Sequence, residues 1–331
     1  MKYIALPEEK TRRLSFYLAM EEYVAYHIDE QDCFFMWQVE PSVIFGRNQL
    51  IENEVNIPFC RERGIKTYRR KSGGGCVYAD MSNIMFSYIT KDEAVGFTFN
   101  RYINMVVLVL RKMGVDAKAS GRNDVMISDR KVSGNAFYHV SKRGQMGSGR
   151  SIVHGTMLYD TNMENMVASI TPSDEKLISK GVKSVRQHIA LLKDYIDLDI
   201  EAFKRYTREH LCTSETILDE EAERDIEDIE REYLTQEFIY GSNPRYTQVN
   251  RQRIEGVGDI EVRMEIKNGI IKSVNILGDY FLLGDLNAEI IQPLTGKPLD
   301  HDSIFAALPE HPEQIIRNIT KNQLTSLIYG K

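Results

Sequence analysis

Arg69-Arg70-Lys71-Ser72-Gly73-Gly74-Gly75-Cys76-Val77-Tyr78 is the stretch of this chain that says most about its fold and chemistry. Two arginines stand beside three glycines, so fixed positive charge meets a backbone whose N–H groups no side chain shields. Such a stretch is typical of a cradle for a phosphate or a carboxylate. Residues 66–69 and 75–78 have the composition of strands, which places the glycines at a turn between two strands.

Neither of the common phosphate-binding motifs fits this stretch. A P-loop requires Lys-Ser or Lys-Thr after the glycines, and the dinucleotide motif requires the spacing G-x-G-x-x-G. Three further segments follow along the chain: Gly121-Arg122-Asn123-Asp124, then Lys131-Val132-Ser133-Gly134-Asn135-Ala136, then His154-Gly155-Thr156.

In this order, the four segments resemble the lipoate–protein ligases. That family carries Arg-Arg-x-Ser-Gly-Gly-Gly, Gly-Arg-Asn-Asp, a lysine within Gly-x-Lys-x-x-Gly-x-Ala-like sequence, and His-Gly-Thr. The resemblance extends to Gly181-Val182-Lys183-Ser184-Val185-Arg186 and to a tract from about residue 241 to residue 278, so it covers nearly the whole chain. It implies an α+β fold, with a catalytic domain of the biotin and lipoate ligase type and a small C-terminal α+β accessory domain.

The length of 331 residues fits two domains. The residue pattern changes after Asn243-Pro244, so we predict a catalytic domain at 1–246 and an accessory domain at 247–331. Alternating apolar residues at 260, 262, 264 and 266, followed by Asn268-Gly269, predict a hairpin. Apolar periodicity predicts helices at 15–27, 99–113, 201–212 and 219–234, and near 284–291, 301–308 and 312–328.

Composition narrows the class of protein and its location. The chain is 42% hydrophobic and 27% charged, as in ordinary globular proteins. It has no apolar run of the roughly 18 residues that a membrane helix needs and no apolar leader at its start, so we expect a cytoplasmic protein that spans no membrane. The four cysteines form no C-x-x-C pair, which argues against a zinc site.

The charge is unevenly distributed along the chain. The net charge is −6, yet residues 1–160 hold 22 Lys and Arg against 18 Asp and Glu. A basic part within an acidic chain suits a nucleotide phosphate or an acidic partner, and the overall acidity argues against nonspecific binding of nucleic acid.

The resemblance implies that a carboxylic acid is activated with ATP. Both reactants are negative, so catalysis requires positioning and neutralisation of charge. Arg70 can fork onto a phosphate, and in the family the lysine equivalent to Lys131 contacts the acyl carboxylate and the α-phosphate. We therefore expect Lys131 to be catalytic. The binding site for ATP and lipoate is expected at Arg70, Ser72, Gly73, Gly74, Gly75, Cys76, Val77, Tyr78, Asn123, Asp124, Lys131, Gly134, His154, Gly155 and Thr156.

Two of these positions have a second interpretation. Asp124 is a candidate ligand for Mg²⁺ bound with the triphosphate, because Mg²⁺ takes few carboxylates and keeps phosphate oxygens and water for the rest. Asn123-Asp124 can equally form an ordinary turn. A strand histidine such as His154 is more often packed in the core than catalytic.

Three departures from the family pattern bear on the nucleotide. Ala79 stands before Asp80 where the family has histidine, and Val153 stands before His154 where it has a second histidine. The family sequence Val-Arg-x-Arg-Val-x-Asn reads Val185-Arg186-Gln187-His188-Ile189-Ala190-Leu191 here, in a loop that caps the adenylate. These changes remove two imidazoles, a guanidinium and an amide, so weaker nucleotide binding is expected.

The sequence thus predicts a lipoate–protein ligase that forms lipoyl-AMP and transfers the acyl group to a lysine. The acceptors would be lipoyl domains of 2-oxoacid dehydrogenase E2 subunits or the glycine-cleavage H protein. One alternative is a transferase that takes preformed lipoyl-AMP, and another is an octanoyl transferase with a thioester intermediate, for which Cys76 is the plausible thiol. A biotin ligase, which should show a Gly-Arg-Gly-Arg-type loop, and a noncatalytic carrier, which would not need Lys131, fit less well.

Overall fold

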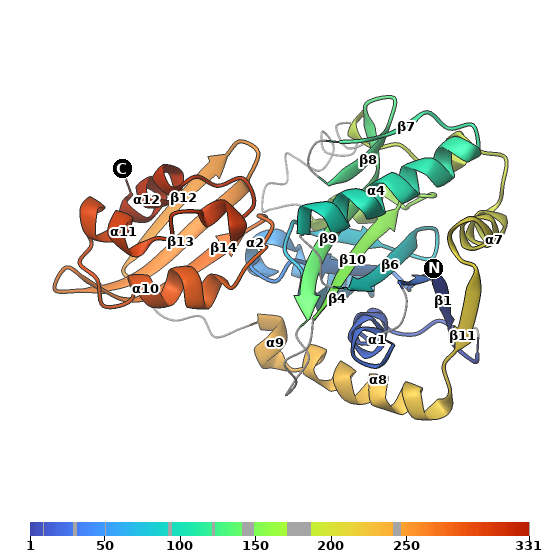
Figure 1. The fold of residues 1–331 in the computed structure, drawn as a ribbon, viewed down its shortest axis with the longest axis horizontal. Helices are drawn as coiled ribbons and strands as arrows, with labels where there is room; N and C mark the ends of the chain where they lie inside the picture. The colour runs from blue at the N-terminus through green and yellow to red at the C-terminus, as the bar shows by residue number, and fades with distance from the viewer. Residues whose placement is uncertain are drawn as a thin grey trace. The chain divides into compact units, whose positions relative to one another are not determined.

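The computed structural model describes residues 1–8, 10–28, 32–49, 51–91, 95–120, 123–140, 149–170, 187–240 and 246–330 (Figure 1). The chain forms two compact units. The first comprises Met1–Phe45, Glu52–Arg70 and Cys76–Ile239, and the second comprises Gly46–Ile51, Lys71–Gly75 and Tyr240–Lys331.

The second unit is not simply the part of the chain after residue 246, because it also contains two early segments, 46–51 and 71–75. These segments belong to it because they bond to the end of its sheet: Gly278 N donates to Asn48 O (2.8 Å) and Gly74 N donates to Tyr280 O (3.0 Å). No single cut through the sequence can describe such an arrangement.

A mixed eight-stranded sheet is the centre of the first unit. Its strand order is β11-β1-β2-β6-β10-β9-β8-β7. The strands are β1 (Lys2–Ala5), β2 (Cys33–Trp37), β6 (Ile84–Lys91), β7 (Ala117–Ala119), β8 (Asp124–Ile127), β9 (Arg130–Val140), β10 (Arg150–Met157) and β11 (Ser214–Ile217). β1 runs parallel to its neighbours β2 and β11, while the pairs from β2 through β7 are antiparallel.

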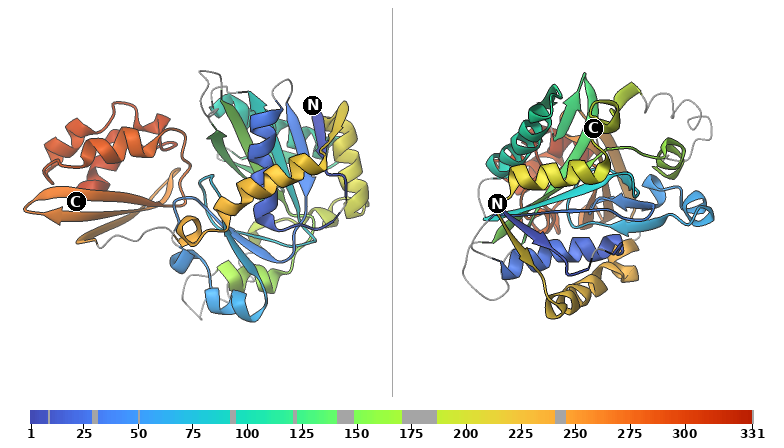
Figure 2. Two further views of the ribbon diagram at one scale, coloured as in Figure 1. Left: turned by 90° about the horizontal axis from the view of Figure 1, so that it is seen from below. Right: turned by 90° about the vertical axis from the view of Figure 1, so that its right-hand side faces the viewer.

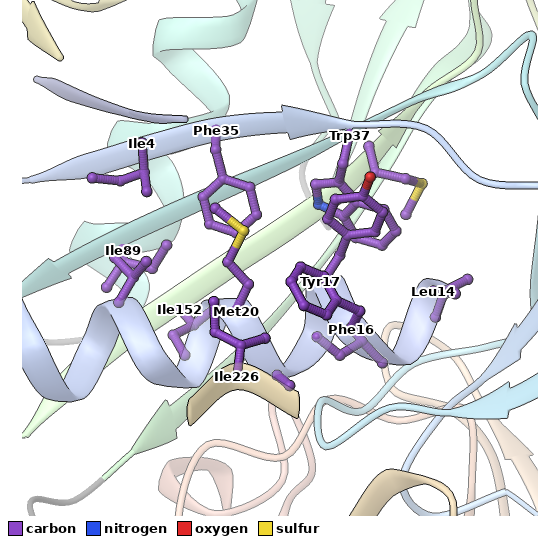
Figure 3. Packing of buried hydrophobic residues seen from close by; sticks show 14 of the residues in the cluster. Ile4, Leu14, Phe16, Tyr17, Met20, Phe35, Trp37, Ile89, Ile152 and Ile226 are labelled. Carbon is purple, nitrogen blue, oxygen red and sulfur yellow. The ribbon is translucent and has the colours of Figure 1, made fainter. Parts of the chain in front are cut away.

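Helices cover both faces of this sheet (Figure 2). α1 (Leu14–His27) and α8 (Glu220–Tyr233) pack on one face, and α4 (Val95–Lys112) and α7 (Ile200–Leu211) pack on the other. Successive strand residues face opposite sides: Phe35 and Trp37 meet α1 in the core drawn in Figure 3, whereas Phe34 joins the core under α4. This double coverage explains why β2 is apolar throughout.

A smaller sheet of the first unit carries the start and the end of the glycine stretch. Its order is β4-β3-β5, with β3 (Ser42–Phe45), β4 (Lys66–Arg69) and β5 (Val77–Ala79). The glycines therefore connect two strands, as predicted, although β3 lies between those strands in the sheet. Three short helices complete this part: α2 (Ile51–Glu54), α3 (Ile57–Glu62) and α5 (Met163–Ile170).

The second unit contains the predicted hairpin. β13 (Gly258–Lys267) and β14 (Ile270–Gly278) are joined by Asn268 and Gly269, both with positive φ (56° and 73°), and β12 (Gln248–Ile254) adds a third antiparallel strand. Asn and Gly are the residues that accept this turn. The alternating apolar residues of β13 form a core with the helical segments that follow, namely 287–294, α11 (His301–Ala307) and α12 (Lys321–Tyr329).

One expected helix differs in its bounds, and several strands of the structure were not predicted. The helix expected at 312–328 is a short 3₁₀ turn at Pro312–Gln314 followed by α12, which begins only at Lys321 because Thr320 forms a capping box with Gln323. β1, β7, β11 and β12 were not predicted. β11 and β12 are edge strands with mostly exposed side chains, so they lack the apolar pattern of a half-buried strand. In the part of the chain that the structure describes, no helix is long and apolar enough to cross a membrane.

Candidate active site

A β-bulge sets the direction of the Lys131 side chain. β8 and β9 form a hairpin in which Asp124 is opposite Gly134 and Val125 is opposite Ser133, but Met126 is opposite Lys131, so Val132 is an extra residue. In a regular strand, residues three apart lie on opposite faces. The extra residue brings Lys131 onto the same face as Asp124 and Gly134, which is how a bulge re-aims a side chain.

Lys131 and Asp124 form an ion pair on this face. Lys131 Nζ is 2.9 Å from Asp124 Oδ1, and the two side chains are 39% and 24% exposed. Within the described residues, this buried carboxylate oxygen has no hydrogen-bond donor of good geometry, so the ammonium is the charge that compensates it. Gly134 lies beneath the lysine: a Cβ there would be 2.6 Å from both Cε and Nζ of Lys131. A side chain at position 134 would therefore push the end of the lysine away from its place over the strand.

The segment at residues 188–191 is bonded to the backbone of Lys131. Ala190 N donates to Lys131 O (2.8 Å), and Lys131 forms an isolated bridge with Ile189. The departures at His188 and Leu191 therefore flank residues that touch the backbone of Lys131. Gly121, Arg122 and the motif at 181–186 lie outside the described residues.

Asn123 and Asn135 bond reciprocally at the start of β8. Asn123 Nδ2 donates to Asn135 O (2.8 Å), and Asn135 Nδ2 donates to Asn123 O (2.9 Å). The structure thus brings together four of the predicted residues, Asn123, Asp124, Lys131 and Gly134, and it adds Asn135.

His154, Gly155 and Thr156 are buried on β10. His154 Nδ1 contacts Glu21 Oε2 of α1 at 2.9 Å, and Thr156 Oγ1 donates to Met85 Sδ (3.4 Å). Glu21 is fully buried. Sequence reasoning missed Glu21, because a glutamate in a helix is usually exposed. His154 is packed in the core, the second of the two interpretations offered for it.

The two arginines of the glycine stretch occupy buried positions. Arg69 lies over the ring of Phe45 (4.6 Å to its centroid) and donates from Nε to Ile239 O (2.9 Å), so it helps hold the end of α9 (Gln236–Tyr240). Arg70 Nη1 donates to Ile44 O (3.2 Å), and burial lowers the pKa of Arg70 to about 10. Arg70 keeps its positive charge at neutral pH even so.

Ser72, Gly73, Gly74 and Gly75 belong to the second unit. A Cβ at Gly73 would be 2.6 Å from Tyr280 O, and Gly74 N donates to that same oxygen. Ser72 is buried and accepts a hydrogen bond from Arg47 N at its carbonyl oxygen (2.9 Å). Close approach of two backbones is therefore one reason for glycine at position 73.

Cys76, Val77 and Tyr78 continue the stretch in the first unit. Val77 and Tyr78 belong to β5, and burial raises the pKa of Tyr78 to about 12. Burial likewise raises the pKa of the Cys76 thiol to about 12 and those of Cys60 and Cys212 to about 11. Because the thiolate is the nucleophile, these values disfavour a thioester intermediate.

Replacing Cys76 with alanine should leave activity within about threefold of the unmutated enzyme, since at pH 8 only about one thiol in ten thousand would be ionised. Iodoacetamide should label Cys76 slowly at pH 8 and faster as the pH rises toward 12. Cys60→Ala is a matched control, because it removes another buried thiol. Loss of activity in Cys76→Ala alone, with an acyl-thioester visible in the intact mass of the unmutated protein, would show covalent catalysis.

Two family models match this chain. The model of the lipoyl protein ligase A/B catalytic domain matches residues 14–212, and that of the bacterial lipoate protein ligase C-terminus matches residues 243–328. The chain belongs to the lipoate–protein ligase family. This ligase is 34% identical to lipoate-protein ligase LplJ of Bacillus subtilis over 325 residues, which cover 94% of this chain and 96% of that protein.

Solved structures agree with this family. A lipoate ligase of Thermoplasma acidophilum, from a bipartite lipoylation system studied with its E2 lipoyl domain, is 26% identical with a TM-score of 0.65, covering 75% of this chain and 98% of that one. LipL1 of P. falciparum, in complex with lipoate, has a TM-score of 0.77 at 19% sequence identity. The match covers 100% of this chain and 99% of that one. A lipoate-protein ligase A bound with ATP has a TM-score of 0.61 at 23% sequence identity, and the match covers 73% of this chain and 99% of that one.

The last two structures, at these identities, show the fold alone. Together the matches confirm the resemblance inferred from the motifs and the α+β fold. This ligase is an enzyme of the lipoate–protein ligase type.

Proposed function

We propose that this ligase activates lipoate with ATP and transfers the lipoyl group to a lysine of a lipoyl domain. In the first half-reaction the lipoate carboxylate attacks the α-phosphorus, a P–O bond breaks, and pyrophosphate leaves. In the second, the neutral ε-amine of the acceptor lysine attacks the acyl carbon of lipoyl-AMP, the amide forms, a proton is lost from nitrogen, and AMP leaves.

The position of Lys131 is the main support for this proposal. The bulge at Val132 turns its side chain toward Asp124, and Gly134, which has no side chain, leaves room for its ammonium there. Its charge would neutralise the carboxylate and the α-phosphate as they approach, and would stabilise the departing AMP. Arg70, the glycine stretch and residues 154–156 are proposed to complete the binding site for ATP and lipoate. Along the sequence, residues 1–246 would then contain the catalytic domain and 247–331 the accessory domain, with 46–51 and 71–75 grouped with the second unit.

The residues present can hold Mg²⁺ that is bound together with a nucleotide. No cluster of three or more His, Cys, Asp or Glu side chains suitable for a metal occurs among the described residues. Mg²⁺ bound with a nucleotide needs only one or two carboxylates, and Asp124 supplies one, whose Oδ1 is 2.9 Å from Lys131 Nζ. Asp124 would hold the ion, which would supply neutralisation of the triphosphate charge.

The proposed acceptors are lipoyl domains. The similarity to the Thermoplasma acidophilum system, studied with an E2 lipoyl domain, supports lipoyl domains as acceptors. We propose the E2 subunits of 2-oxoacid dehydrogenases, the glycine-cleavage H protein, or both, as the acceptors of this enzyme.

Pyrophosphate release tests the proposal directly. The enzyme with ATP, Mg²⁺ and lipoate should release pyrophosphate without acceptor, and addition of a lipoyl domain should give amide-linked lipoate by intact mass. Because His188 and Leu191 replace the family's Arg and Asn beside Lys131, we expect a high KM for ATP and faster transfer from supplied lipoyl-AMP. Arg at position 188 together with Asn at position 191 should lower that KM.

One outcome would replace the ligase with the transferase alternative. If the enzyme transfers lipoate from synthetic lipoyl-AMP but releases no pyrophosphate with either ATP or GTP, adenylation is not its reaction. Octanoate in place of lipoate, in the same assay, measures the acyl preference.

A further inference from the structure

Two asparagine side chains continue the β8–β9 ladder where its backbone pairing ends. The last paired residues are Asp124 and Gly134, so the next position of the same register would place Asn123 opposite Asn135. There, each side chain donates to the other residue's backbone oxygen, at 2.8 Å and 2.9 Å. The start of β8 is thus held by two amide groups.

Gly155 makes this arrangement possible. It is directly opposite Asn135 on β10, and a Cβ at position 155 would be 1.8 Å from Asn135 Oδ1 and 2.7 Å from Cγ. Asn135 is only 3% exposed, so its side chain has little room to move aside. Gly155 does not have a positive φ, so its own backbone conformation accepts alanine. The Asn135 side chain is the nearest obstacle to a Cβ at this position, and the backbone oxygen of Gly134, at 3.0 Å, is a second and smaller one.

The reciprocal pair is next to the Lys131–Asp124 ion pair along both strands. Asn123 precedes Asp124, and Asn135 follows Gly134, over which Lys131 crosses. Asp124 is also held by Ser120, whose N donates to Asp124 O and whose Oγ accepts from Asp124 N. Loss of the Asn135 donor would remove one of the bonds that hold the chain just before Asp124, so the carboxylate and the lysine would be positioned less precisely.

We propose that Asn135 is a positioning residue for Lys131, acting through Asn123 and Asp124, and that position 155 is glycine to make room for it. This inference rests on the proposed role of Lys131 in adenylation. Asn135 would set the geometry of the charged pair without touching either member of it. Its loss should therefore lower kcat and leave the KM for lipoate nearly unchanged.

A double-mutant cycle tests the steric part. Asn135→Ala and Gly155→Ala should each lower kcat for pyrophosphate release about 10- to 100-fold, with the KM for lipoate within about twofold. The double variant should be at most about twofold slower than Asn135→Ala, because the new methyl group then has no side chain to displace and meets the Gly134 oxygen at 3.0 Å. Multiplied losses in the double variant would show that Gly155 acts independently of Asn135.

A second variant separates positioning from stability. Asn135→Asp keeps the shape but loses the donor at neutral pH, so it should be as slow as Asn135→Ala. Thr90→Val is the matched control. Thr90 is a buried residue on β6 of the same sheet, and its hydroxyl donates to Asp32 Oδ1 (2.6 Å), so this variant also removes a buried donor. It should lower the melting temperature without lowering kcat more than twofold. Normal kcat in Asn135→Asp, measured well below its melting temperature, would overturn the inference.

Chemical labelling gives a readout that does not depend on activity. An amine-reactive ester should label Lys131 severalfold faster in Asn135→Ala than in the unmutated chain, because the ion pair is loosened, while labelling of Lys193 stays constant. Equal rates at Lys131 would overturn the inference whatever the activity. An unmutated enzyme that releases no pyrophosphate, with Lys131 labelling still dependent on Asn135, would instead contradict the proposed function alone.

Discussion

Lys131→Ala should abolish both half-reactions, lowering kcat for pyrophosphate release and for transfer from lipoyl-AMP by at least about 10³-fold. The ammonium is the charge closest to Asp124, and preorganised charge of this kind contributes on the order of 3–4 kcal/mol or more to the transition state. The chain should still fold, because the Lys131 side chain is 39% exposed, and the melting temperature should fall by only a few degrees as Asp124 loses the ammonium that compensates it. Steady-state kinetics and the melting temperature are the measurements.

Lys193→Ala is a matched control for this experiment. Lys193 forms an ion pair with Asp160 (2.7 Å) and is 42% exposed, so it has the same chemistry and exposure as Lys131 away from the bulge. Its removal should change kcat less than twofold. A residual kcat of Lys131→Ala within about tenfold of the unmutated enzyme would show that another cation carries the charge.

The sequence pointed to Lys131, whose catalytic role stays a prediction, but it did not reveal the environment of this lysine. The motif around Gly134 identified the lysine, and the strands on both sides had clear apolar patterns. The bulge at Val132 is a difference of one residue between two paired strands, and that difference appears only when the strands are aligned with each other. Asn135 was missed for the same reason, because its partner Asn123 is opposite it only in the folded ladder.

Elements with long apolar periods were predicted well, and those held by tertiary contacts were not. The stripe of α4 and the turn at Asn268-Gly269 are local signals. β11 (Ser214–Ile217) is a strand only because β1 offers it an edge to pair with. The membership of Lys71–Gly75 in the second unit depends on bonds to Tyr280, some two hundred residues later in the chain.

Glu21 is the clearest case in which burial contradicts the sequence pattern. Its carboxyl group accepts from Ser87 Oγ (2.5 Å) and Tyr138 OH (3.2 Å) and contacts His154 Nδ1 (2.9 Å). Trp37 Nε1 donates to the same serine (2.9 Å). Four segments of the first unit, α1, β6, β9 and β10, thus converge on one buried carboxyl group, and Trp37 of β2 joins them through Ser87.

Glu21→Ala should therefore destabilise the first unit by about 3–5 kcal/mol, because the serine, tyrosine and histidine would lose a buried partner and a cavity would remain. Urea unfolding followed by tryptophan fluorescence measures this, since Trp37 is the chain's single tryptophan and belongs to the network. Glu21→Gln, which keeps the size and one acceptor oxygen, should cost clearly less. Glu227→Ala, at an exposed position of α8, should change the free energy of unfolding by less than about 0.5 kcal/mol. If Glu21→Ala were as mild as Glu227→Ala, the network would contribute specificity of packing without net stability.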